Sequence, residues 1–134
     1  MQAGRFAHWK PPSIRADGST KWGWHVHPRH IDKLSIGKRV DIGFGTYLQP
    51  EAGITLEDDV QIGSHCAIYS ISTIDNKRGA VTIKHGAKIG THSSVMPGVT
   101  IGENAIIGAH SFVNADIPPN VTAFGVPAQV HHKK

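Results

Sequence analysis

Large apolar residues recur every six positions through most of the chain, and a second set of mostly smaller residues recurs between them at the same interval. The large set is Ile36, Ile42, Leu48, Leu56, Ile62, Ile68, Ile83, Ile89, Val95, Ile101, Ile107 and Val113. The second set is Val40, Thr46, Ile54, Val60, Cys66, Val81, Ala87, Ser93, Val99, Ala105, Ser111 and Ile117. This interval fits neither an amphipathic helix, with a period of about 3.6 residues, nor a lone strand, with a period of about 2.

Short repeats of this kind are typical of a parallel β-helix, in which each repeat buries its apolar face by stacking on its neighbours. Three hexads form one triangular coil of roughly 18 residues, so the pattern predicts an all-β fold of about four coils. The register slips by two residues after Leu48 and by nine after Ile68. Both slips follow the third hexad of a coil, so we expect both insertions at the same corner of the prism.

The hexads divide the chain into three regions. Residues 1–30 lack the repeat and contain all three tryptophans, so we expect an irregular or short-stranded N-terminal cap that covers the open first coil. Residues 31–118 are predicted to form the hexapeptide-repeat β-helix, with a protruding loop at residues 69–80. Residues 119–134 are predicted to form an extended C-terminal tail.

Composition excludes several classes of protein. The formal net charge is +4, and Lys and Arg are scattered rather than gathered on one face, so we expect no nucleic-acid partner. The sequence contains no signal peptide and no apolar run that would span a membrane, so we expect a cytoplasmic protein without a membrane partner. Cys66 occupies a small-residue core position, where we expect a buried, unreactive thiol.

A His-rich stretch at the N-terminus invites comparison with a metal site. His25, His27 and His30 lie close together in the sequence, but Pro28 interrupts them. A closed zinc site needs three or four ligands in a defined geometry, so we expect no metal site here.

The hexads, together with the run IGTHSSVMPGVTIGENAIIGAHSFVNADIPPNVTAFGVPAQV at residues 89–130, resemble the hexapeptide-repeat acyltransferases. That family includes galactoside, maltose and serine acetyltransferases and the amino-sugar N-acetyltransferases, and the likeness covers residues 36–130. The resemblance implies a left-handed β-helix and a homotrimer with active sites between neighbouring subunits. It also implies acetyl-CoA as the acyl donor, lying along the outer coils.

The same resemblance implies positions for acetyl-CoA binding. In the sugar acetyltransferases, backbone groups that match Thr91 and Ala109 contact the pantetheine arm. A Thr-Lys pair that often serves the nucleotide end is replaced here by Asn114 and Ala115. Lys133 or Lys134 would then supply the cation for the 3′-phosphate, since that group needs only a nearby positive charge.

The catalytic pattern departs from that of the family. The sugar O-acetyltransferases carry a general-base His on the loop that matches residues 69–80, whereas this loop has none and Thr73 lies nearest to the expected place. An amine acceptor needs less activation than a hydroxyl, which favours N-acetylation of a nucleotide-linked amino sugar for a surface polysaccharide. Asp75 on the loop and Glu51 on the smaller insertion are the acidic candidates, because both insertions share a corner.

Three histidines supply a second set of catalytic candidates. His65, His92 and His110 occupy the same hexad position in successive coils, so we expect their imidazoles to stack at one corner, with rungs about 4.8 Å apart. In a trimer, His92 or His65 would serve as the base across the subunit interface. A chance alignment of polar turn residues remains an alternative, and His85 lies at a different corner.

Other functions stay open at this point. Acetyl transfer to the hydroxyl of a sugar or of a serine-like acceptor is one alternative. Gamma-class carbonic anhydrases share the fold, but their zinc-binding His spacing differs from that of His85, His92 and His110. A non-catalytic scaffold is favoured by the missing loop His.

Overall fold

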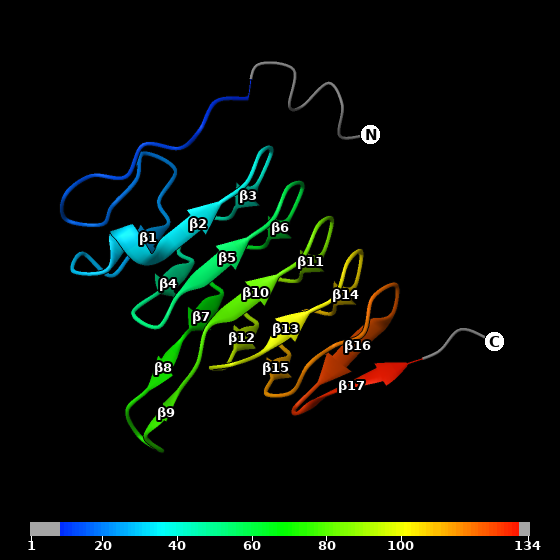
Figure 1. The fold of residues 1–134 in the computed structure, drawn as a ribbon. Coiled ribbons are helices and arrows are strands. Elements are labelled where there is room, and N and C mark those ends of the chain that lie inside the picture. The colour runs from blue at the N-terminus through cyan, green and yellow to red at the C-terminus, as the bar shows by residue number, and fades with distance from the viewer. Residues whose placement is uncertain (1–8, 132–134) are drawn as a thin grey trace.

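Three β-sheets with largely parallel strands form the sides of a triangular solenoid in the computed structural model, which describes residues 9–131 (Figure 1). The first sheet contains β1 (His25–Val26), β4 (Tyr47–Gln49), β7 (Ala67–Tyr69), β12 (Ser94–Val95) and β15 (Phe112–Val113). The second contains β2 (Leu34–Ile36), β5 (Ile54–Leu56), β10 (Val81–Ile83) and β13 (Thr100–Ile101). The third contains β3 (Asp41–Ile42), β6 (Gln61–Ile62), β11 (Lys88–Ile89), β14 (Ile106–Ile107), β16 (Thr122–Gly125) and β17 (Ala128–His131).

Successive turns of the chain therefore form four coils: β2–β3–β4, β5–β6–β7, β10–β11–β12 and β13–β14–β15. Strands pair in register from coil to coil, so equivalent residues lie over one another. Ile62, for example, pairs with Ile89, which pairs with Ile107. The structure therefore confirms the predicted all-β solenoid of about four coils.

The hexad pattern corresponds to the core of the prism. Every large apolar residue from Ile42 to Val113 is buried, and Ile36 at the open first coil is partly buried. The second set is also buried from Thr46 to Ile117, while Val40 is partly buried. Cys66 is 2% exposed and burial raises the pKa of its thiol, which confirms the prediction of a buried cysteine.

Both insertions lie at the corner between the first and second sheets, as expected. Residues 50–53 connect β4 to β5, and the longer insertion connects β7 to β10. The longer one is more ordered than the predicted loop, because β8 (Ile71–Ser72) and β9 (Lys77–Arg78) pair as an antiparallel hairpin. This β8–β9 hairpin projects from the side of the solenoid (Figure 1).

The two ends of the solenoid contain regular structure. At the N-terminal end, β1 pairs with β4, and Trp24 and Val26 are buried against the core, before a short 3-10 helix at Ile31–Lys33. At the C-terminal end, β16 pairs in parallel with β14, and β17 folds back to pair antiparallel with β16. The strand edges of the terminal coils are therefore partly covered.

Replacing Ile101 by Asp should unfold the last coils, because its side chain is fully buried among aliphatic residues and a carboxylate there has no partner. We expect the free energy of unfolding to fall by roughly 4 kcal/mol or more in urea titrations. Ile106 provides the matched control, since it is 46% exposed in the adjacent strand of the same coil. Ile106→Asp should change stability by less than about 1 kcal/mol; equal losses for the two variants would contradict the assigned register.

Candidate active site

Three imidazoles form a stacked column at the corner between the third and first sheets. The ring centroids of His65 and His92 lie 5.1 Å apart with a 14° angle between planes, and those of His92 and His110 lie 5.0 Å apart at 15°. All three side chains are exposed. The stacking predicted from the hexad positions is thus present, and we call this set the His column.

The backbone of these turns sets the spacing of the His column. His65, His92 and His110 all have positive φ angles, of 56°, 60° and 59°. In each tight turn the residue two positions earlier is glycine, and a Cβ added at Gly90 would lie 2.6 Å from the backbone nitrogen of Ala109. Consecutive coils therefore approach closely at this corner only because the side chain there is absent.

Hydroxyl and thiol groups inside the prism donate hydrogen bonds to the backbone carbonyl oxygens of this corner. The hexad pattern did not predict this role. The hydroxyl of Thr46 donates to the carbonyl oxygen of Gly63 at 2.7 Å, and that of Ser93 donates to Gly108 at 3.1 Å. The thiol of Cys66 donates to the carbonyl oxygen of Gly90 at 3.3 Å. Each bond joins a coil to the next one, so small polar residues in the second register hold the turns in line.

A series of hydrogen bonds links His92, in the third coil, to the second coil. Thr91 Oγ1 lies 2.8 Å from the carbonyl oxygen of Ser64, 3.1 Å from Ser64 Oγ and 2.8 Å from His92 Nδ1. The backbone N–H of His92 also donates to the Ser64 carbonyl oxygen, at 3.1 Å. His92 is thus held by its backbone and by one ring nitrogen.

Two of the residues expected to bind acetyl-CoA lie at this same corner. Thr91 and Ala109 each precede a member of the His column, and the backbone N–H of His110 donates to the Thr91 carbonyl oxygen at 2.9 Å. Asn114 follows β15 and is exposed. Lys133 and Lys134 lie outside the described residues.

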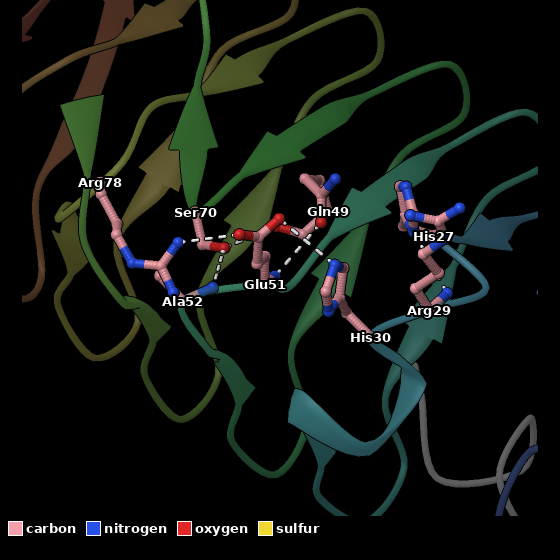
Figure 2. A network of polar contacts seen from close by, with 8 residues as sticks. All are labelled: His27, Arg29, His30, Gln49, Glu51, Ala52, Ser70 and Arg78. Atoms are coloured by element: carbon pink, nitrogen blue, oxygen red, sulfur yellow. Dashed lines mark hydrogen bonds and ion pairs between the residues drawn. The ribbon is translucent and has the colours of Figure 1, made fainter. Parts of the chain in front are cut away.

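The acidic candidates lie at the insertion corner, separate from the His column. The Glu51 carboxylate lies between Arg78 and His30, with Oε2 2.9 Å from Arg78 Nη1 and Oε1 3.2 Å from His30 Nε2 (Figure 2). The hydrogen bond from Arg78 is the main cause that holds the pKa of Glu51 below its ordinary value. The N-terminal region, the shorter insertion and the β8–β9 hairpin therefore meet at this carboxylate.

Asp75 lies in the turn of the β8–β9 hairpin, where it is exposed. Its Oδ2 is 3.7 Å from Lys77 Nζ, and a hydrogen bond with Ser72 is the largest cause of its lowered pKa. Thr73 is exposed in the same turn. These contacts are local to the hairpin and include no member of the His column.

Another polar cluster lies at the remaining corner, between the second and third sheets. Asp59 accepts from Arg39 Nε at 2.7 Å and lies 3.1 Å from His85 Nε2, and the Arg39 hydrogen bond is the main cause of the lowered pKa of Asp59. His85 is thus separate from the His column. Within residues 9–131, no three His, Cys, Asp or Glu side chains converge as a metal site would require.

A cavity of about 610 Å³ opens beside the first coil. It is lined by Trp9, Lys10, Pro11, Pro12, Ser13, Arg15, Lys21, Trp22, Trp24, Ile36, Val40, Asp41 and Ile42. None of the predicted site residues within residues 9–131 lines it. No helix between residues 9 and 131 has the length and apolar character needed to cross a membrane.

Two family models match the repeats. The bacterial transferase hexapeptide (six repeats) model matches residues 80–115, and the hexapeptide repeat of succinyl-transferase matches residues 33–71. The two matches cover the coils on both sides of the β8–β9 hairpin.

Curated relatives are similar over most of the chain. The galactoside O-acetyltransferase of Lactococcus lactis is 38% identical over 112 residues, which cover 72% of this chain and 54% of that protein. The galactoside O-acetyltransferase of Escherichia coli is 35% identical over 114 residues, covering 78% and 56%. The chain therefore spans little more than half the length of these relatives.

Solved structures share the fold. A hexapeptide-repeat-containing acetyltransferase from Vibrio cholerae, in complex with acetyl-CoA, superposes with a TM-score of 0.75 at 26% identity, covering 81% of this chain and 63% of that one. A maltose O-acetyltransferase from Clostridium difficile gives the same TM-score and identity, covering 83% and 63%. The left-handed β-helix expected from the sequence is the fold of these hexapeptide-repeat neighbours.

Removing the Arg78 guanidinium should raise the pKa of Glu51 towards its ordinary value of 4.5. A pKa that is lowered by folding stabilises the fold above the unfolded value, and this contribution disappears as the pH falls through the folded value. We expect Arg78→Gln to reduce the pH dependence of stability below pH 4.5, with the Glu51 carboxyl followed by NMR. Lys77→Gln is the control, because Lys77 pairs with Asp75 instead; an unchanged Glu51 pKa in Arg78→Gln would contradict the assigned cause.

Proposed function

Because the chain belongs to the hexapeptide-repeat acyltransferase family, we propose that it transfers an acetyl group from acetyl-CoA to a small-molecule acceptor. The observation that carries this proposal is the corner that bears Thr91, Ala109 and the His column. It joins the positions expected to contact pantetheine to exposed groups able to accept a proton. The Vibrio cholerae neighbour complexed with acetyl-CoA supports the choice of donor.

We propose the amino group of a nucleotide-linked sugar as the acceptor, used in surface polysaccharide synthesis. The support is chemical: the insertion at residues 69–80 contains no His, so a hydroxyl acceptor lacks the base that the family resemblance would put there. A neutral amine attacks a thioester directly and needs a base mainly to remove a proton afterwards. Acetyl transfer to a sugar hydroxyl is the second candidate, favoured by the names of the galactoside O-acetyltransferase relatives.

Among the four candidate bases, the His column is preferred to the carboxylates. Glu51 and Asp75 have lowered pKa values, caused mainly by hydrogen bonds from Arg78 and Ser72 respectively. A carboxylate stabilised in its charged form is a weak proton acceptor near neutral pH. His92 and His65 are exposed, so we propose one of them as the general base. Glu51 and Asp75 then belong to the insertion corner and not to the catalytic corner.

We also propose a homotrimer with a shared site. In one chain the His column and the β8–β9 hairpin lie at different corners, so a second subunit is needed to bring the hairpin of one chain opposite the His column of another. Thr91, Ala109 and Asn114, the predicted cofactor residues that the structure describes, do not line the cavity beside the first coil. A cleft formed between subunits accounts for both features.

The acceptor is tested by following free thiol release from acetyl-CoA with a panel of nucleotide amino sugars and of sugars that offer only hydroxyls. With an amine, the rate of the wild-type protein should rise towards alkaline pH as the ammonium form is depleted. His92→Ala should lower the rate by roughly 10²-fold at neutral pH and recover in part at high pH. His85→Ala, at another corner, should leave the rate unchanged.

A different outcome would identify the second candidate. Turnover confined to hydroxyl acceptors, with no alkaline recovery in His92→Ala, would overturn N-acetylation and leave acetyl transfer in place. No thiol release with any acceptor would overturn acetyl transfer itself.

Sedimentation should show a trimer that persists at the concentrations used for assays. Since the proposed site needs two chains, mixing impaired His92→Ala subunits with impaired subunits in which residues 71–78 are replaced by a Gly-Ser linker should raise the neutral-pH rate above that of either variant alone. Mixed trimers then contain some sites with an intact hairpin and an intact His92. An active monomer, or no gain in rate after mixing, would exclude a shared site that requires both elements.

A further inference from the structure

The hydroxyl of Thr91 determines which nitrogen of His92 carries the proton. The carbonyl oxygen of Ser64 lies 2.8 Å from Thr91 Oγ1 and is only an acceptor, so the single hydroxyl proton of Thr91 points to it. Without that proton, two oxygen atoms would face each other with their lone pairs at this distance. The other two neighbours of Thr91 Oγ1 must therefore be donors.

One of those donors is Ser64 Oγ at 3.1 Å, and the other is His92 Nδ1 at 2.8 Å. A hydrogen on Nδ1 leaves the lone pair of a neutral imidazole on Nε2. The chain of donors thus runs from His92 to Thr91 and from Thr91 to the Ser64 carbonyl, and it fixes the tautomer of His92.

The stacked neighbours leave that lone pair accessible. His65 and His110 lie against the two faces of the His92 ring, whereas a nitrogen lone pair lies in the plane of the ring. The His92 side chain is exposed, and its Nε2 has no hydrogen bond to any residue between 9 and 131. The free edge of the ring therefore points its acceptor away from the corner backbone.

The other members of the His column lack this arrangement. His65 follows Ser64, whose hydroxyl is directed to Thr91 in the next coil, and His110 follows Ala109, which has no hydroxyl. The ring of His65 also lies over Gly45, where an added Cβ would be 2.8 Å from His65 Nε2. Only in the third coil does the residue before the His hold its imidazole.

We propose that His92 Nε2 is the base for acetyl transfer and that Thr91 is the positioning residue that keeps it in the proton-accepting tautomer. This inference rests on the proposed function. The acceptor nitrogen attacks the thioester carbon, a C–N bond forms, and its surplus proton passes to His92 Nε2. When the C–S bond breaks, the same proton passes from the imidazolium to the thiolate of CoA, so the His is neutral again.

The hydrogen bonds through Thr91 stabilise the imidazolium form of His92 as well as the tautomer of its neutral form. When Nε2 is protonated, the Nδ1–H still donates to Thr91 Oγ1, whose own proton remains on the Ser64 carbonyl. No rearrangement of hydrogen bonds is then needed during the reaction, which is the condition for electrostatic preorganisation.

Nitrogen-15 NMR of the imidazoles, at a pH where His is neutral, tests the tautomer without turnover. Wild-type protein should show His92 with the proton on Nδ1, and Thr91→Val should lose that preference because valine has the same shape but no hydroxyl. Thr91→Ser should retain it. Ser64→Ala is the matched control, because it removes a donor to the same oxygen but leaves the carbonyl that takes the Thr91 proton.

Acetyl transfer should follow the tautomer. We expect Thr91→Val to lower kcat by about 10-fold to 10²-fold, no more than loss of the positioned base itself would cost, with KM for acetyl-CoA nearly unchanged, and Thr91→Ser to restore the rate. A Thr91→Val protein that keeps the Nδ1–H tautomer, or one that loses it at full activity, would overturn the proposal. A wild-type protein with the expected tautomer but no transferase activity would overturn the proposed function and the role of His92 as base, while the Thr91 tautomer assignment would stand.

Discussion

Parallel pairing from coil to coil is the interaction on which the rest of this molecule depends. Because each strand pairs in register with the equivalent strand of the next coil, any residue type repeated in the sequence becomes a column in space. Isoleucine and valine columns fill the prism, and the same rule stacks His65, His92 and His110 about one rung apart at the surface. Core and candidate site therefore have one structural cause.

The corner turns hold the candidate catalytic residues in place. Glycine lets the coils approach, and buried side chains such as Thr46 and Ser93 donate to carbonyl oxygens one coil further on. The backbone of the turns is thereby held from inside, and the hydrogen bonds of Thr91 Oγ1 hold the side chain of His92. A rigid corner is what a base needs if its geometry is to be set before the substrate binds.

Periodicity in the sequence was sufficient for the fold but only partly for the site. It predicted the buried hexads, the insertion corner and the stacking of the His column, because each follows from counting residues along a repeat. It did not predict the β8–β9 hairpin or the contact of Glu51 with Arg78 and His30, which join segments without repeat spacing. The Thr91 hydrogen bonds were also missed, since they depend on side-chain rotamers and not on position in the hexad.

The central claim is that the His column corner receives the acyl donor. The most direct measurement is an NMR titration of the imidazole resonances with CoA, which binds without reacting. The account predicts that His92 and His110, beside Thr91 and Ala109, shift in a saturable manner while His85, at the corner between the second and third sheets, does not. Saturable shifts confined to His85, or CoA binding that leaves the His column unperturbed, would contradict it.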